Sequence, residues 1–166
     1  FFDLILPFIT LEVNGFNVSI IILPVFGSVV ASGLFYNAKD GQKIKGSGIP
    51  VLIESMIFKS KDINAKLGVK KLLASSLTIG SGGSGGKEGP IALIGASLSS
   101  LLGDRFKLPR KQRRIIIVCG LSAGISSVFH APIGGAIFGI EILIQGISLV
   151  NTLPIFLSSA IGALIG

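Results

Sequence analysis

Charged side chains are scarce in this sequence. Asp, Glu, Lys and Arg make up 14% of the 166 residues, whereas a soluble domain carries about 25%. Apolar residues account for 49% of the chain, and its mean hydropathy is +0.81. This composition argues against a water-soluble domain and favours a chain that lies in a membrane.

Metal-ligating and nucleophilic residues are few. The sequence has one cysteine, Cys119, and one histidine, His130. A single cysteine forms no internal disulfide, and Cys119 in its apolar run is expected to be a small buried hydrophobe. One Cys and one His do not make a zinc cluster, and no Ser, His and acid stand in a catalytic pattern. We therefore expect no enzyme and no cofactor.

The basic residues are not spread evenly. The formal net charge is +7, and fourteen of the fifteen Lys and Arg lie in three clusters, Lys39–Lys45, Lys59–Lys71 and Arg105–Arg114. Only Lys87 lies outside them. Long apolar stretches separate the clusters, as expected for loops on the cytoplasmic side of a membrane. The pattern predicts an integral, multi-pass membrane protein in contact with the lipid bilayer and no nucleic-acid partner.

The apolar stretches differ in length. Val18–Tyr36 is 19 residues long without a charge, which predicts a spanning helix. Ser47–Phe58 is only 12 residues long with basic clusters on both flanks, so it predicts a re-entrant half-helix, with Pro50 in its first turn.

Two longer stretches leave one side of the membrane and return to it. Leu72–Leu102 has a glycine-rich centre, and Ile115–Val150 is broken near His130 by the proline that follows. Each stretch predicts two short helices. In Ile115–Val150, the second helix is expected to run from Ala131 or Pro132 to Glu141. A further helix is expected from about Asn151. The fold class predicted is all-α, with broken and re-entrant helices.

Three segments place glycines and a proline at the start of a membrane helix. A helix N-terminus presents unpaired N–H groups and about half a positive charge, so it attracts an anion without a desolvated lysine. Binding that is favourable but escapable suits conduction. The segments are Gly46–Pro50, Gly86–Pro90 and Ala131–Gly135.

Glu88 stands out among the acids because a carboxylate at membrane depth is costly and marks function. At a helix start it can occupy the anion site itself, as a tethered substitute for the ion, and leave on protonation or displacement. This predicts a gate. The alternative is a structural ion pair with the neighbouring Lys87.

The glycine run also resembles nucleotide-binding patterns. Gly80–Gly85 fits G-x-G-x-x-G, which is weak by itself, and no alternation of strands and helices surrounds it. A phosphate loop is excluded because Ser81 replaces a glycine and Glu88 replaces the metal-binding hydroxyl. Elsewhere, small residues recur at four-residue spacing, Gly120 with Gly124 and Gly135 with Gly139, which predicts close helix packing.

These motifs together resemble one family. Gly46–Pro50 (GSGIP) and Gly86–Pro90 (GKEGP) are similar to the first two signature motifs of the CLC chloride channels and chloride/proton antiporters, and Gly120–Glu141 is similar to the helix pair that follows. The similarity runs from about Val18 to Leu143 in the right order. It implies that residues 1–166 are part of a CLC transmembrane domain, the first half of its inverted repeat. Phe1 at one end and the apolar run at the other suggest truncation at both ends, and later motifs of the pore are absent.

The resemblance also implies roles. Ser47 would offer its hydroxyl to the central anion (the alternative is that it only caps its helix), and Glu88 would be the external gate. It implies a homodimer with a separate pore in each subunit. The anion-binding residues expected are Ser47, Gly48, Ile49, Gly86, Lys87, Gly89, Pro90 and Ile91.

One position departs from the family's antiporters. They commonly carry two consecutive glutamates at the end of this helix, the second as the internal proton relay. Here Glu141 matches the first and Ile142 stands at the second. This favours a chloride channel, gated by voltage or anion occupancy, with a chloride/proton antiporter as the alternative. Glu141 is a candidate for a proton pathway or simply an acid near water. A scaffold without transport would leave Glu88 unexplained.

Overall fold

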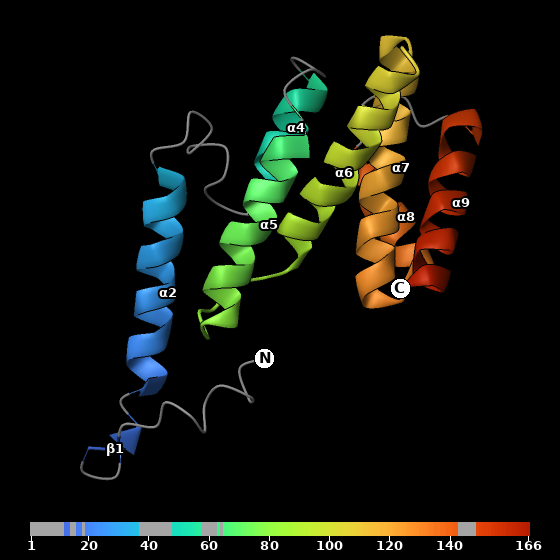
Figure 1. The fold of residues 1–166 in the computed structure, drawn as a ribbon. Coiled ribbons are helices and arrows are strands. Elements are labelled where there is room, and N and C mark those ends of the chain that lie inside the picture. The colour runs from blue at the N-terminus through green and yellow to red at the C-terminus, as the bar shows by residue number, and fades with distance from the viewer. Residues whose placement is uncertain are drawn as a thin grey trace.

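The computed structural model describes residues 12–13, 16–17, 19–36, 48–57, 63, 65–142 and 149–166. In these ranges the chain is almost entirely helical (Figure 1), which confirms the predicted all-α class. A two-stranded antiparallel hairpin of two residues per strand, which the hydropathy pattern did not predict, precedes the first helix. The elements are β1 (Glu12–Val13), β2 (Phe16–Asn17), α2 (Ser19–Tyr36), α4 (Ile49–Ile57), α5 (Ala65–Gly80), α6 (Glu88–Arg105), α7 (Arg110–Phe129), α8 (Pro132–Ile142) and α9 (Leu149–Ile165).

The first helices follow the predicted stretches. Helix α2 coincides with the uncharged run, and α4 forms a short helix inside the predicted half-helix. Helix α5 differs, since it begins at Ala65 and takes in Lys66, Lys70 and Lys71. The expectation that these three lysines lie in a connecting loop is wrong, and so is the same expectation for Arg110, Lys111, Arg113 and Arg114, which lie in the first turns of α7. Lysine and arginine have high helix propensities, and their long aliphatic stems can cover apolar surface.

Both predicted breaks are present. The chain leaves α5 at Gly80 and starts α6 at Glu88, so the glycine-rich run is the connection between them. Helix α7 ends at Phe129, where His130 takes a left-handed conformation (φ 48°, ψ 35°), and α8 restarts at Pro132. The proline explains this restart because its fixed φ suits the first helical position and it needs no N–H partner there.

Helices α6 and α7 form an antiparallel hairpin whose backbones touch. A β-carbon on Gly95 would collide with the carbonyl oxygen of Gly120, and one on Gly120 would collide with the hydroxyl of Ser99. The same holds between α7 and α8, where Gly139 faces Ser122. The prediction that the spaced glycines serve close packing is therefore confirmed.

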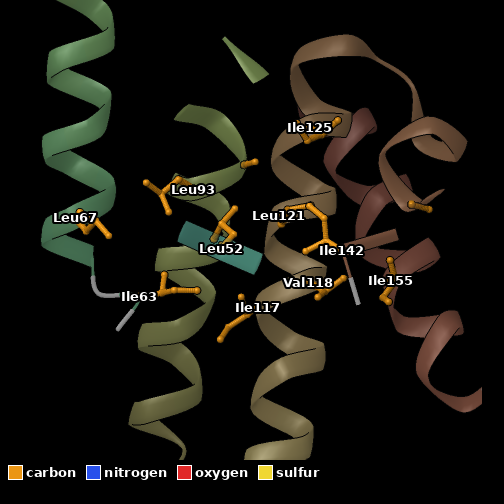
Figure 2. Close-up of a cluster of buried hydrophobic side chains, with 13 residues drawn as sticks. Leu52, Ile63, Leu67, Leu93, Ile117, Val118, Leu121, Ile125, Ile142 and Ile155 are labelled. Carbon is orange, nitrogen blue, oxygen red and sulfur yellow. The ribbon is translucent and has the colours of Figure 1, made fainter. Parts of the chain in front are cut away.

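One cluster of buried apolar side chains joins α4, the start of α5, and α6 to α9 (Figure 2). Leu52 from α4 and Leu93 from α6 are fully buried in it, as are Ile117 and Leu121 from α7. Its members are Leu52, Ile63, Leu67, Ala92, Leu93, Ala96, Ile117, Val118, Leu121, Ile125, Ala136, Ile142 and Ile155. This core fixes the starts of α4 and α6 relative to each other.

Large apolar side chains also cover the outside. Phe26 is 67% exposed on α2 beside the exposed Ile22, Val25 and Val29, and Leu153 is 72% exposed on α9. An apolar patch such as the one on α2 is unusual for a soluble monomer. Among the described residues, α7 is long and apolar enough to cross a bilayer by length and composition. Shorter apolar helices cover Ile22–Gly33, Pro132–Ile142 and Thr152–Ile165.

A tight turn joins α6 to α7. The N–H of Lys107 donates to the carbonyl of Asp104 (3.1 Å), and the N–H of Leu108 donates to that of Gly103 (2.9 Å). Lys107 has φ 49°, in the position where such a helix end usually carries glycine. From α7, Arg113 reaches back and donates to Ser100 Oγ (2.8 Å) and Asp104 Oδ2 (2.9 Å). These contacts fix the geometry of the turn.

Candidate functional site

The start of α6 is the centre of the candidate site. Lys87 precedes the helix, and the first backbone bond runs from the N–H of Ile91 to the carbonyl of Lys87 (3.1 Å). The first N–H groups of a helix have no partner within it, and Pro90 has no N–H to satisfy. Among the described residues, no side chain caps this helix start. Backbone N–H groups at the start of α6 are therefore suited to hold an anion.

Accessibility changes sharply along this segment. Gly86, Lys87 and Glu88 are exposed, Gly89 and Pro90 are buried, and Ile91 is half-buried. The polar groups up to Glu88, the first residue of α6, are accessible, while the next residues of the first turn are packed into the protein. The site therefore combines an accessible approach with a fixed backbone.

The side chain of Glu88 folds back over the glycine that precedes it. A β-carbon on Gly86 would collide with Glu88 Oε2 and would lie 3.2 Å from its Cδ. The carboxylate thus lies on the approach to the helix, beside the exposed loop. Negative charge is favourable near a helix N-terminus. Glycine at position 86 gives the carboxylate this space.

Lys87 points to another partner. Its ammonium nitrogen lies 5.2 Å from the centre of the Phe129 ring at the end of α7, within the range of a cation–π contact. Both Lys87 and Glu88 are described, and no ion pair joins them. The structure therefore gives no support to the alternative of a structural pair between these neighbours. The contact instead brings the Gly86–Pro90 segment to the break between α7 and α8.

The start of α4 packs against the same helix turn. Gly48 has φ +88°, which favours glycine, and its carbonyl accepts from the N–H of Leu52 (3.2 Å). A β-carbon on Gly48 would lie 3.4 Å from Leu93 Cδ2 and 3.6 Å from the carbonyl oxygen of Gly89. Gly48 is buried and Ile49 is half-buried. Two of the predicted helix starts are thus neighbours, while Ser47 lies outside the described residues.

Glu141 and its neighbour differ in environment. Glu141 is exposed near the end of α8. Ile142 is 5% exposed and belongs to the core cluster with Val118 and Leu121 (Figure 2). Across the described ranges, no three His, Cys, Asp or Glu side chains gather where they could hold a metal ion.

Two contacts were not predicted from the sequence. The contact between Lys87 and Phe129 joins residues far apart in the chain, and the isolated position of Lys87 among the basic residues was its only signal. Arg113 of α7 pairs with Asp104 of α6 across the turn that joins the two helices. An acid and a base on either side of a short turn could have suggested it.

Comparison with known proteins identifies the family. The family model for voltage-gated chloride channels matches residues 27–166, which is most of the chain. The chain belongs to the CLC chloride channel family. The resemblance of the glycine and proline motifs is thereby confirmed, and with it the expected all-α membrane fold class.

Individual relatives agree with this family. A ClC-type voltage-gated chloride channel, ClcB, of Yersinia pseudotuberculosis is 30% identical over 142 residues, which cover 86% of this chain and 34% of that protein. A chloride/fluoride channel protein of Pseudomonas syringae is 34% identical over 125 residues, covering 75% and 27%. An uncharacterized protein of Methanocaldococcus jannaschii is 35% identical over 128 residues, covering 74% and 31%. The CLC chain spans about a third of the length of these relatives.

Proposed function

We propose that the chain forms part of a membrane pore for chloride and that Glu88 is its gate. One observation carries the proposal: the carboxylate of Glu88 folds back over Gly86 on the approach to the start of α6. A chloride ion and a carboxylate are both attracted to a helix N-terminus. In this mechanism they compete, so that protonation or displacement of Glu88 opens the path.

The residues around this helix start would form the anion site. The backbone N–H groups near Gly86, Glu88 and Gly89 would face the ion, with the packing of Pro90 and Ile91 holding the helix start in place. Lys87 would raise the local anion concentration, since its charge sits on an exposed side chain. Gly48 and Ile49 at the start of α4 would line the deeper side, and the Ser47 hydroxyl would bind the central anion.

A passive channel is favoured over a chloride/proton antiporter. The position after Glu141 carries Ile142, which packs in the core and has no proton to exchange. The relatives from Yersinia and Pseudomonas are also named channels. In the proposed channel, voltage or anion occupancy acts on Glu88, and Glu141 lies outside the ion path as an exposed acid.

The membrane arrangement follows from the same proposal. The chain would cross the bilayer several times, with α4 re-entrant and the exposed apolar faces in contact with lipid or with other parts of the protein. A homodimer would form through α8 and α9. Ile133 (65%), Leu153 (72%) and Leu157 (59%) are exposed on these helices, and apolar surface of this kind suits a subunit interface.

Chloride flux measures the proposed function directly. The full-length protein is reconstituted in liposomes, and chloride efflux is followed with external pH as the variable. We expect Glu88→Gln to remove the pH dependence and leave flux open. Glu54→Gln, an exposed acid on α4, is the matched control and should behave as the unaltered protein.

Two outcomes would contradict parts of the proposal. An unchanged pH profile in Glu88→Gln would remove the gate assignment. Chloride-driven proton uptake by the unaltered protein would replace the channel with the antiporter, and its loss in Glu141→Gln would then place that acid in the proton pathway.

A further inference from the structure

The turn between α6 and α7, together with the helix ends on either side of it, carries a dense positive charge. From residue 104 to residue 114 there are six Lys or Arg and one Asp, a formal charge of +5. The single acid, Asp104, accepts a hydrogen bond from the buried Arg113. Arg105, Lys107, Arg110 and Lys111 are exposed around it. The acid is thus engaged from the inside, and the positive charge of the turn faces outward.

These charges sit on a fixed scaffold. The two backbone hydrogen bonds to Gly103 and Asp104 close the turn, and the Arg113 side chain ties the start of α7 to α6. Lys107 keeps a positive φ that glycine would adopt more easily. Because the backbone of the turn is already ordered, binding costs little further backbone conformational entropy.

An apolar stripe leads directly to the turn. Leu98 and Leu102 lie four residues apart on α6, so they share one face, and Phe106 follows at the same spacing just after the helix end. The three side chains are 53%, 51% and 70% exposed. Phe106 lies between Arg105 and Lys107. Apolar side chains that end in a ring beside basic residues match the boundary between acyl chains and headgroups of a bilayer.

We propose that this turn binds the headgroups of anionic lipids through Arg105, Lys107 and Lys111, with Phe106 in the adjoining acyl region. The charge is complementary to phosphate oxygens, which accept hydrogen bonds from guanidinium and ammonium groups. The continuous apolar stripe selects a lipid over a free anion or a nucleic acid. The inference rests on the proposed function only in requiring that the chain lie in a bilayer.

Lipid retention by the full-length protein tests this surface. The delipidated protein in detergent is titrated with phosphatidylglycerol or with phosphatidylcholine, and bound lipids are counted by native mass spectrometry. The test variant combines Arg105→Gln, Lys107→Gln and Lys111→Gln. The matched control retains every charge with Arg105→Lys, Lys107→Arg and Lys111→Arg.

We expect the unaltered protein and the charge-retaining variant to prefer phosphatidylglycerol. Each basic residue near a membrane surface contributes an affinity factor of about five, so the triple Gln variant should bind it about a hundredfold more weakly. If that variant fails to fold, Lys111→Gln alone should show a loss of about fivefold. Binding of phosphatidylcholine should be the same in all variants.

Equal preference for phosphatidylglycerol in the Gln variant would overturn the proposal. The proposal would also fail if the Gln variant bound as much lipid as the unaltered protein while Lys111 of the unaltered protein formed crosslinks to an acidic segment of the same protein. The turn would then serve an internal contact. Chloride flux from vesicles of phosphatidylcholine alone separates the two proposals. A protein that retains the lipid through this turn but moves no chloride would contradict the proposed function and leave the lipid site intact.

Discussion

The ammonium nitrogen of Lys87 lies 5.2 Å from the centre of the Phe129 ring. This contact joins the residue before α6 to the last residue of α7, and it leaves the neighbouring Glu88 without a basic partner from within its own segment. A lysine next to a carboxylate at a helix start could neutralise it. Here the two side chains have separate surroundings, so the carboxylate is available to compete with an anion.

Removal of the Phe129 ring should weaken anion binding. In Phe129→Leu the cation–π contact is lost, which is worth about 0.5–1 kcal/mol at an exposed site, and Lys87 is no longer held beside the approach to α6. We expect chloride affinity, measured by isothermal titration of the full-length protein, to fall about two- to fivefold. Phe129→Tyr retains the ring and should bind normally; equal affinities for the Leu and Tyr variants would contradict a role for this contact.

Gly86→Ala should displace the gate. The added methyl would collide with Glu88 Oε2, so the carboxylate must leave its place on the approach to α6. We expect chloride flux to lose its dependence on external pH, as in Glu88→Gln, and the double variant to show no further change.

Gly85→Ala is the control for this substitution. Its β-carbon would meet Ile79 Cγ1 at 3.4 Å, an ordinary contact, and its flux should keep the normal pH profile. If Gly86→Ala also kept that profile, the position of the Glu88 carboxylate would have no bearing on gating.

Gly95→Ala should destabilise the α6–α7 hairpin. The methyl group would collide with the carbonyl oxygen of Gly120, which is backbone and cannot rotate away, so the helices must separate. Overpacking of this kind lowers the free energy of unfolding by about 1–3 kcal/mol. Thermal unfolding of the full-length protein in detergent measures the loss. Gly33→Ala in α2 meets no atom of the described residues within 4 Å and should be neutral or stabilising; similar losses in both variants would refute the close-contact explanation.

Ile142→Glu should introduce proton movement. The side chain would replace a residue that is 5% exposed in the core, so a charged form is costly there and the new acid would bind a proton readily. We expect a chloride gradient to drive proton uptake into liposomes, with a lower unfolding temperature. Ile142→Gln has the same size without a titrating group and should show only the lower stability. Proton uptake by neither variant would mean that Ile142 does not limit the coupling.

Much of the helical order could be predicted because it depends on local rules. Pro132 restricts the backbone of the residue before it, which predicts the break near His130. The uncharged run Val18–Tyr36 predicts α2. The start of α5 was missed because charge alone was used to separate loop from helix. Lys71 is 8% exposed. Its aliphatic stem packs against the protein, so a basic residue of this kind can be part of a helix.

The site was predictable in part. The Gly86–Pro90 segment predicts a helix start that carries an acidic residue, because glycine, proline and glutamate at this spacing are enough to indicate one. The approach of Gly48 to Gly89 and of Lys87 to Phe129 depends on how separate helices pack, and a single sequence carries no direct record of such distances. Prediction of the roles of Ser47 and Glu141 came from the family resemblance and stays a prediction.

The packing of Gly48 against the first turn of α6 limits what can move. Gly89 and Pro90 are buried, and Leu93 belongs to the core cluster, so a shift of the backbone at the helix start would disturb this packing. The movable component at this point is the Glu88 side chain, with only a few rotatable bonds. Exposed side chains change rotamer within picoseconds to nanoseconds. If opening of the pore takes milliseconds, its slow step therefore belongs to protonation or to another part of the protein, and not to the rotation of this side chain.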